Sequence, residues 1–198
     1  MSKLRRKRYA SGRERRGVLK NRVGIEHRPA VVDSKKRIGD WEGDTVIGGG
    51  RKGVLVTLVE RKSRYTLAHP LRPSTVRGDA GHCRFAAPPQ TCLQDTDLDN
   101  GKEFAEHEFI ASCLRAKVYF AKPYCSWQRG LNENTNGLLR QFFPKGCSLL
   151  KVTQAQVDEA VYLLNHRPRK CLGYRTPHEV FYNLPVRPLT LHSVALCT

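Results

Sequence analysis

The sequence lacks any long apolar segment. No window approaches the roughly 18 apolar residues that a membrane-spanning helix needs. The basic N-terminus is followed by more charged residues instead of an apolar stretch, so it does not have the pattern of a secretory signal. We therefore expect a cytosolic protein with no membrane partner.

Paired cysteines are also missing. The seven cysteines are an odd number with no C-x-x-C pair, which argues against a disulfide framework and against a zinc ribbon. We expect reduced thiols that are mostly buried, as free cysteines commonly are. They are Cys83, Cys92, Cys113, Cys125, Cys147, Cys171 and Cys197.

Acidic residues are scarce relative to basic ones. Lys and Arg number 35 against 18 Asp and Glu, which gives a formal net charge of +17 and favours a polyanionic partner. Hydrophobic residues at 39% and charged residues at 27% are near globular norms and exclude a wholly disordered chain. The length of 198 residues favours one domain with a short appendage.

The basic charge is concentrated at the N-terminus. Residues 1–28 hold eleven Lys or Arg and only two Glu. Because apolar periodicity is almost absent there, we expect residues 1–36 to form a disordered basic arm. The arm either follows a nucleic-acid backbone, adding affinity without sequence preference, or is a solvated segment with no specific role. The basic body of the chain favours the first alternative.

The rest of the chain has the pattern of a mixed α/β domain. Segments 39–48, 54–60 and 64–71 have strand composition, and the turns between them predict an antiparallel meander. A helical pattern over 103–116, a short strand at 117–121, and helices at 127–143 and 153–168 follow, with Thr153 as the N-cap of the last helix. This order predicts a mixed sheet with flanking helices in a core spanning 37–182, with a tail at 183–198.

One segment, 73–94, does not fit this pattern. A helix is expected there, to connect the third strand to the fourth. Two glycines and two prolines oppose it, and they are Gly78, Gly81, Pro88 and Pro89.

Several carboxylates are candidates for metal chemistry on phosphodiesters, because Mg²⁺ prefers hard oxygen ligands. They are Asp40, Glu42, Asp44, Asp95, Asp97, Asp99 and Glu133. The period of two places the first three on one face of a strand. We expect Asp40 and Glu42 to lie at a solvated strand edge. Asp44, just before apolar residues, is the best ligand candidate of the three.

Asp99 and Glu133 have less distinctive surroundings. Asp99 precedes Asn-Gly, which indicates either the carboxyl end of a strand, where α/β sheets bind ligands, or an Asx-turn. Glu133 lies two helical turns before Arg140, so both are on one helix face. Taken alone, that pair is typical of surface charge.

Taken together, these motifs identify a family. WEGD (41–44), DNGKEF (99–104), PYCSWQRGLNENTNGLLRQFFPKG (123–146) and NHRPRKCLGYRTPHEVF (165–181) occur in order, with 33 residues between Asp99 and Glu133. This series resembles the DDE catalytic core of bacterial insertion-sequence transposases, in particular the insertion-sequence-thirty family. The likeness covers residues 37 to the C-terminus apart from the irregular segment, and it implies the ribonuclease-H-like fold of retroviral integrase cores and a place in the bacterial cytosol.

The resemblance also implies a site and a reaction. Asp44, Asp99 and Glu133 would be the catalytic residues and would bind two Mg²⁺ or Mn²⁺ ions, for cleavage and strand transfer of double-stranded DNA at element ends and target. We expect a homo-oligomer, as for transposases that act on paired ends. The residues that we expect to contact DNA are Lys102, Tyr124, Trp127, Gln128, Arg129, Arg140, Arg167, Arg169 and Lys170. For Trp127, packing in the core is an equally good interpretation.

The sequence departs from the family pattern in two places. Relatives carry an N-terminal helix-turn-helix region that reads the inverted repeats, and this sequence starts in the basic linker after it. Over about 77–94, glycine, proline and cysteine replace an amphipathic helix and an apolar strand, as two compensating frame shifts would leave. Three functions therefore remain open: a transposase catalytic domain, a non-catalytic DNA-binding remnant that interferes with intact transposase, and a ribonuclease-H-like nuclease without strand joining.

Overall fold

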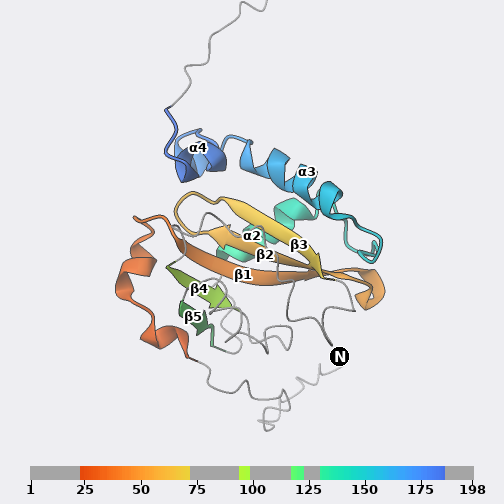
Figure 1. The fold of residues 1–198 in the computed structure, drawn as a ribbon, viewed down its shortest axis with the longest axis horizontal. Coiled ribbons are helices and arrows are strands. Elements are labelled where there is room, and N and C mark those ends of the chain that lie inside the picture. The colour runs from red at the N-terminus through yellow and green to blue at the C-terminus, as the bar shows by residue number, and fades with distance from the viewer. Residues whose placement is uncertain (1–22, 72–93, 99–116, 123–129, 186–198) are drawn as a thin grey trace, which may run out of the picture.

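The computed structural model describes residues 23–71, 94–98, 117–122 and 130–185 (Figure 1). Their centre is a five-stranded sheet with the strand order β3-β2-β1-β4-β5. The strands are β1 (Asp40–Ile47), β2 (Val54–Glu60), β3 (Thr66–Leu71), β4 (Asp95–Leu98) and β5 (Lys117–Phe120). Among these described residues, no helix is both long and apolar enough to cross a membrane.

The sheet is mixed, as the sequence predicts. β1, β2 and β3 form an antiparallel meander in which Asp44 is paired with Thr57. β4 is parallel to β1, with Glu42 paired to Asp97, and β5 is parallel to β4. β3 begins two residues later than predicted, because Arg64 has a φ of 65°, a left-handed conformation that belongs to the turn and not to a strand.

Three α-helices are described: α2 (Gly130–Leu139), α3 (Gln154–Asn165) and α4 (Pro177–Phe181). The predicted cap of α3 is confirmed, since Thr153 and Gln156 form a capping box. α2 ends four residues before the predicted end at Phe143. The chain turns there, because the amides of Gln141 and Phe142 donate to the carbonyls three residues earlier, those of Leu138 and Leu139. The predicted helix at 103–116 lies outside the described residues.

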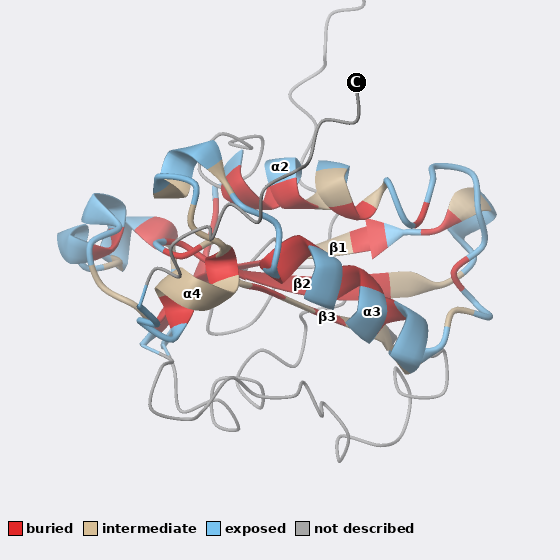
Figure 2. Ribbon diagram, turned by 90° about the horizontal axis from the view of Figure 1, so that it is seen from above, coloured by how far each residue is buried: buried red, intermediate tan, exposed pale blue. Residues whose placement is uncertain are grey.

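The main core lies where α2 and α3 cover the sheet (Figure 2). On β1 the side chains alternate, so Val46 points towards these helices while Trp41 packs on the other face against Phe181 of α4. The core residues shared by sheet and helices are Val46, Leu55, Ala68, Leu139, Phe143, Leu149, Val157, Ala160, Val161 and Leu164.

The hairpin between β1 and β2 is tied to the connection between α2 and α3. The amide of Gly49 donates to the carbonyl of Cys147 over 2.8 Å, and that of Leu149 donates to the carbonyl of Lys52 over 2.7 Å. Gly53 has a φ of 83°, and a Cβ there would lie 2.5 Å from the carbonyl carbon of Leu149. Glycine is therefore required at this approach of two backbones.

Part of the expected arm is folded. Two 3₁₀ turns, Ile25–His27 and Ala30–Ser34, bury Ile25 and Val32. The amide of Phe120 donates to the carbonyl of Val23 over 2.9 Å, so this stretch lies along β5. The folded part of the chain thus begins well before residue 37, and residues 1–22 lie outside the described residues.

The structure tests the expectation about buried thiols at two of the seven cysteines. Cys147 and Cys171 are free thiols, but both are exposed, so the expectation of burial is wrong for them. They lie in short connections and not in the core elements. The other five cysteines, and residues 73–93, lie outside the described residues.

Candidate active site

Asp44 lies on β1 beneath α2 and is half-buried. Its Oδ2 accepts a hydrogen bond of 2.9 Å from Nδ2 of Asn136 on α2. The Asn136 carbonyl in turn accepts a bond of 3.1 Å from the Thr57 hydroxyl on β2. Asp44 and Thr57 are cross-strand partners, so one helix residue connects both strands.

Glu133 and Arg140 lie on the same side of α2 as Asn136, because the three residues are spaced by three and four positions. Glu133 is exposed, and among the described residues its carboxylate forms no ion pair. Arg140 donates to the carbonyl of Ile47 over 2.8 Å and so joins the end of α2 to the end of β1. The structure therefore brings Asp44 and Glu133 to neighbouring elements, connected by Asn136.

The third predicted carboxylate, Asp99, lies outside the described residues. β4 ends at Leu98, the residue before Asp99. In the register of the parallel strands, Asp97 of β4 lies beside Glu42 of β1, two residues before Asp44. Within the described ranges, no group of three or more His, Cys, Asp or Glu side chains could hold a metal ion. Asp44 and Glu133 are hard oxygen donors of the kind that Mg²⁺ and Mn²⁺ prefer, so their chemistry fits such an ion.

The expectation that Asp40 and Glu42 lie at a solvated strand edge is wrong. Asp40 is 0% exposed and Glu42 is 2% exposed. The strand is central and not an edge, because β4 pairs with it on the side away from β2. Asp40 is paired with Arg37 at 2.7 Å, and the same guanidinium reaches Asp95 at 2.6 Å.

Glu42 belongs to a buried ionic network centred on Arg61, which follows β2. Arg61 is 5% exposed and reaches Glu42 at 3.0 Å and Asp97 at 2.7 Å. Asp97 also pairs with Arg28 of the N-terminal turns. The other oxygen of Glu42 accepts the backbone amide of Asn132 over 3.2 Å, at the start of α2. The network thus joins β1, β2, β4 and the helix that carries Glu133.

Burial affects the ionisation of both acids in this network. It raises the pKa of Glu42 above its ordinary value, while Arg61 and the Asn132 amide oppose that rise. Burial raises the pKa of Asp97 to about 6, although Arg28 and Arg61 act in the opposite direction. Arg61 therefore opposes the effect of burial on both acids, and Arg28 does so on Asp97.

Of the predicted DNA contacts, five lie outside the described residues: Lys102, Tyr124, Trp127, Gln128 and Arg129. Arg167 and Lys170 are exposed in the loop after α3. Arg169 is half-buried and donates to the carbonyl of Leu164 over 3.1 Å.

Sequence reasoning missed Asn136 and Arg61. Asn136 sits three residues after Glu133 and four before Arg140, so its helix spacing was a usable signal. Arg61 gave a weaker signal. It is a charged residue at the end of an apolar strand, and a buried guanidinium requires acidic partners.

The chain is similar in sequence to several transposases. It is 44% identical over 167 residues to the transposase for insertion sequence element IS4351 of Bacteroides fragilis, covering 84% of this chain and 51% of that protein. It is 40% identical over 162 residues to the transposase InsI for insertion sequence element IS30A of Escherichia coli strain K12, covering 81% of this chain and 42% of that protein. The chain is a homologue of insertion-sequence transposases.

This transposase homologue spans about half the length of the curated relatives that it matches. It also resembles the putative integrase ORF3 of Spiroplasma virus SpV1-R8A2 B, at 29% identity over 174 residues, 85% of this chain and 54% of that protein. No family model matches it.

Solved structures show the same fold. A chain of the simian T-cell lymphotropic virus intasome in complex with PP2A regulatory subunit B56 gamma has a TM-score of 0.56 at 20% identity, over 77% of this chain and 58% of that one. The catalytic core domain of BIV integrase has a TM-score of 0.53 at 21% identity, over 73% of this chain and 93% of that one. The transposase homologue therefore has the ribonuclease-H-like fold of integrase catalytic cores, as the sequence predicts.

Proposed function

We propose that this chain cleaves DNA and joins DNA strands by metal-dependent phosphoryl transfer during transposition of an insertion sequence. The observation that carries the proposal is the Asp44–Asn136 bond, which fixes β1 against the helix that bears Glu133. The sequence similarity to transposases over most of the chain supports the same reaction class.

Asp44, Asp99 and Glu133 are the proposed catalytic carboxylates. Two divalent cations, Mg²⁺ or Mn²⁺, would activate the attacking oxygen and stabilise the leaving oxygen of an in-line displacement. The residues of the chain hold the site in place: Asn136 orients the Asp44 carboxylate, and Glu42 fixes the first turn of α2 through the Asn132 amide. The proposed substrate is double-stranded DNA, consistent with the net charge of +17.

A strand-transfer assay with pre-cleaved DNA ends tests the proposal. The full chain is compared with Asp44→Asn, Asp99→Asn and Glu133→Gln in Mg²⁺ and in Mn²⁺. Each substitution should abolish product, because each removes one charged metal ligand. Glu159→Gln is the matched control, since Glu159 is an exposed carboxylate on α3 and its loss should leave activity unchanged.

Two results would contradict the proposal. Equal background from the wild-type chain and all three variants favours the non-catalytic, DNA-binding alternative. Nicking without joined product favours a nuclease. The proposed homo-oligomer is checked separately, by light scattering with and without DNA.

A further inference from the structure

A second site lies on the other flank of α2. It is a pocket of about 390 Å³, and four of its lining residues are cations: Lys35, Arg61, Arg64 and Arg169. Glu42 is the one acidic residue in its lining. Arg61 is paired with Glu42, Asp97 and Asp33, so the net positive charge of the lining comes from Lys35, Arg64 and Arg169.

Glu42 offsets only part of the positive charge of the pocket. Its two oxygens are already occupied by Arg61 and by the Asn132 amide. Among the described residues, Lys35 and Arg64 form no ion pair. Nε of Arg61 and Nε of Arg169 are buried without a hydrogen-bond partner within that same part of the chain. Buried donors of this kind require an acceptor.

The environment of Arg169 is consistent with an uncompensated positive charge. Burial and the neighbouring Arg167 both lower the pKa of Arg169 below its ordinary value. An anion in the pocket would oppose both effects, because it would place an opposite charge beside the Arg169 guanidinium.

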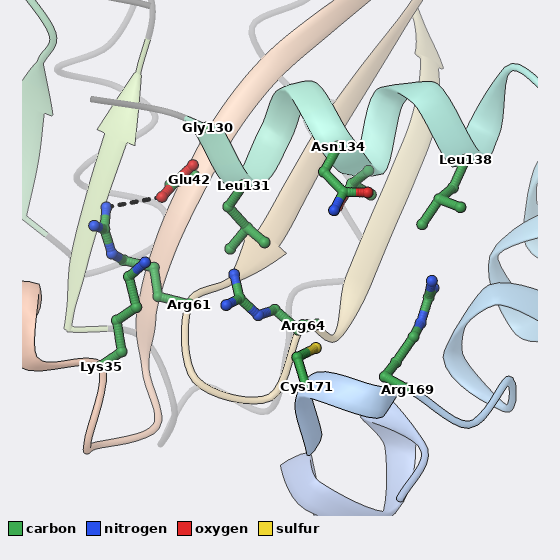
Figure 3. A pocket seen from close by; sticks show the side chains of 11 residues that line it. Lys35, Glu42, Arg61, Arg64, Gly130, Leu131, Asn134, Leu138, Arg169 and Cys171 are labelled. Carbon is green, nitrogen blue, oxygen red and sulfur yellow. Dashed lines mark ion pairs between the residues drawn. The ribbon is translucent and has the colours of Figure 1, made fainter. Parts of the chain in front are cut away.

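The cations enter the pocket from two sides. Lys35, Arg61 and Arg64 lie together near the start of α2, and Arg169 extends from the opposite wall towards Leu138 (Figure 3). Apolar and small polar side chains of α2 form the wall between them, among them Leu131 and Leu138. An anionic group placed in the pocket would meet guanidinium groups from both ends.

The pocket and the proposed catalytic carboxylates occupy different flanks of one helix. Leu131, Asn134 and Leu138 line the pocket and follow a spacing of three and four residues. Glu133 and Asn136 follow the same spacing on a stripe rotated by more than a third of a turn. A DNA strand that crosses α2 from one flank to the other would span the helix diameter of about 10 Å.

We propose that this pocket binds a backbone phosphate of DNA, on the flank of α2 opposite the proposed catalytic carboxylates. The inference rests on the proposed function, because it takes DNA as the substrate. The pocket would fix the path of the strand over α2 without reading its sequence, as phosphate contacts generally do.

Fluorescence anisotropy of the full chain with a labelled duplex tests the inference, in EDTA so that no catalysis occurs. The Arg64→Gln/Arg169→Gln double variant should reduce the slope of log affinity against log salt by about 0.9, the value for one lost phosphate contact. The Lys62→Gln/Lys151→Gln double variant removes the same charge from two exposed positions outside the pocket lining and should leave the slope unchanged. Arg64→Lys/Arg169→Lys keeps both charges and should keep the wild-type slope; an equal loss in the Lys and Gln variants would show that the change comes from instability and would overturn the inference.

Calorimetry with inorganic phosphate separates two sources of the same chemistry. Phosphate binding that the Gln variant loses, with an unchanged DNA slope, would show a small-anion site and overturn the inference. Equal slopes for the pocket variant and its control would overturn it as well. A wild-type chain that performs no strand transfer, yet shows the slope difference, would contradict the proposed function while supporting the pocket.

Discussion

Asn136 donates to Asp44 Oδ2 over 2.9 Å while its carbonyl accepts from the Thr57 hydroxyl over 3.1 Å. An amide side chain can be placed in two orientations, and the Asp44 carboxylate selects between them because it can only accept, which leaves the Asn136 carbonyl to accept from the Thr57 hydroxyl. The NH₂ group is thereby directed at the carboxylate. Thr57 thus acts on the proposed catalytic aspartate through Asn136.

Asn136→Ala should reduce strand transfer by about 10- to 100-fold, the usual cost of losing a group that orients a metal ligand. The Mg²⁺ concentration for half-maximal activity should rise as well, because the carboxylate is no longer held in place. Activity over a Mg²⁺ titration measures both effects.

Thr57→Val is the companion variant, since it removes the hydroxyl with little change of shape. It should cause a smaller loss than Asn136→Ala and shift the Mg²⁺ titration in the same direction. A loss of activity without any shift in the titration would mean that Asn136 has only a structural role.

Arg61→Met should destabilise the fold by about 3 kcal/mol or more, because it leaves Glu42 and Asp97 buried with fewer opposite charges. Lys62→Met, at the next and exposed position, should change the free energy of unfolding by less than about 0.5 kcal/mol. Urea denaturation measures both. Equal losses for the two variants would show that the network around Arg61 contributes no net stability.

Much of the fold was predictable because its signals are local. Alternating strand composition and the turns at 48–53 and 61–63 predict the meander, and Thr153 predicts the start of α3. The left-handed Arg64 at the start of β3 was not predictable, since the sequence favours continuing the strand. The folding of residues 23–36 was missed because it depends on Arg28 pairing with Asp97, 69 positions away.

The site was predictable in part for the same reason. Motif order pointed to Asp44 and Glu133, and the structure connects their elements through Asn136. Alternation placed Glu42 on the same face as Asp44, but it does not show that β4 pairs with β1 or that Arg61 lies between two acids. Such long-range charge pairing depends on the strand order, which local patterns do not determine.

His178 should make stability depend on mildly acidic pH. Its ring stacks on His166 with a centroid distance of 4.6 Å, and burial, together with His166, lowers the pKa of His178 below 6.5. The nearby charged groups include Glu179, which acts in the opposite direction. The unfolded chain therefore binds more protons just below pH 6.5, so stability should be fully present above that pH and fall as the pH decreases through the lowered pKa.

Denaturation midpoints between pH 7.5 and 5.5 test this dependence. His178→Asn should lose less stability over that range than the wild-type chain. His27→Asn, which removes an exposed histidine, should follow the wild type. Parallel curves for all three proteins would contradict the assignment to His178.

Deletion of residues 1–22 should weaken DNA binding and flatten its salt dependence while leaving the fold intact. This segment holds ten Lys or Arg and one Glu, and each phosphate contact that it makes adds about 0.9 to the slope of log affinity against log salt. The deletion must stop before Arg28, because that residue pairs with the buried Asp97 and its loss would destabilise β4. A chain that begins at residue 29 should therefore show a lowered denaturation midpoint, whereas one that begins at residue 23 should not. An unchanged salt slope for the shorter deletion would mean that the first 22 residues do not contact the DNA backbone.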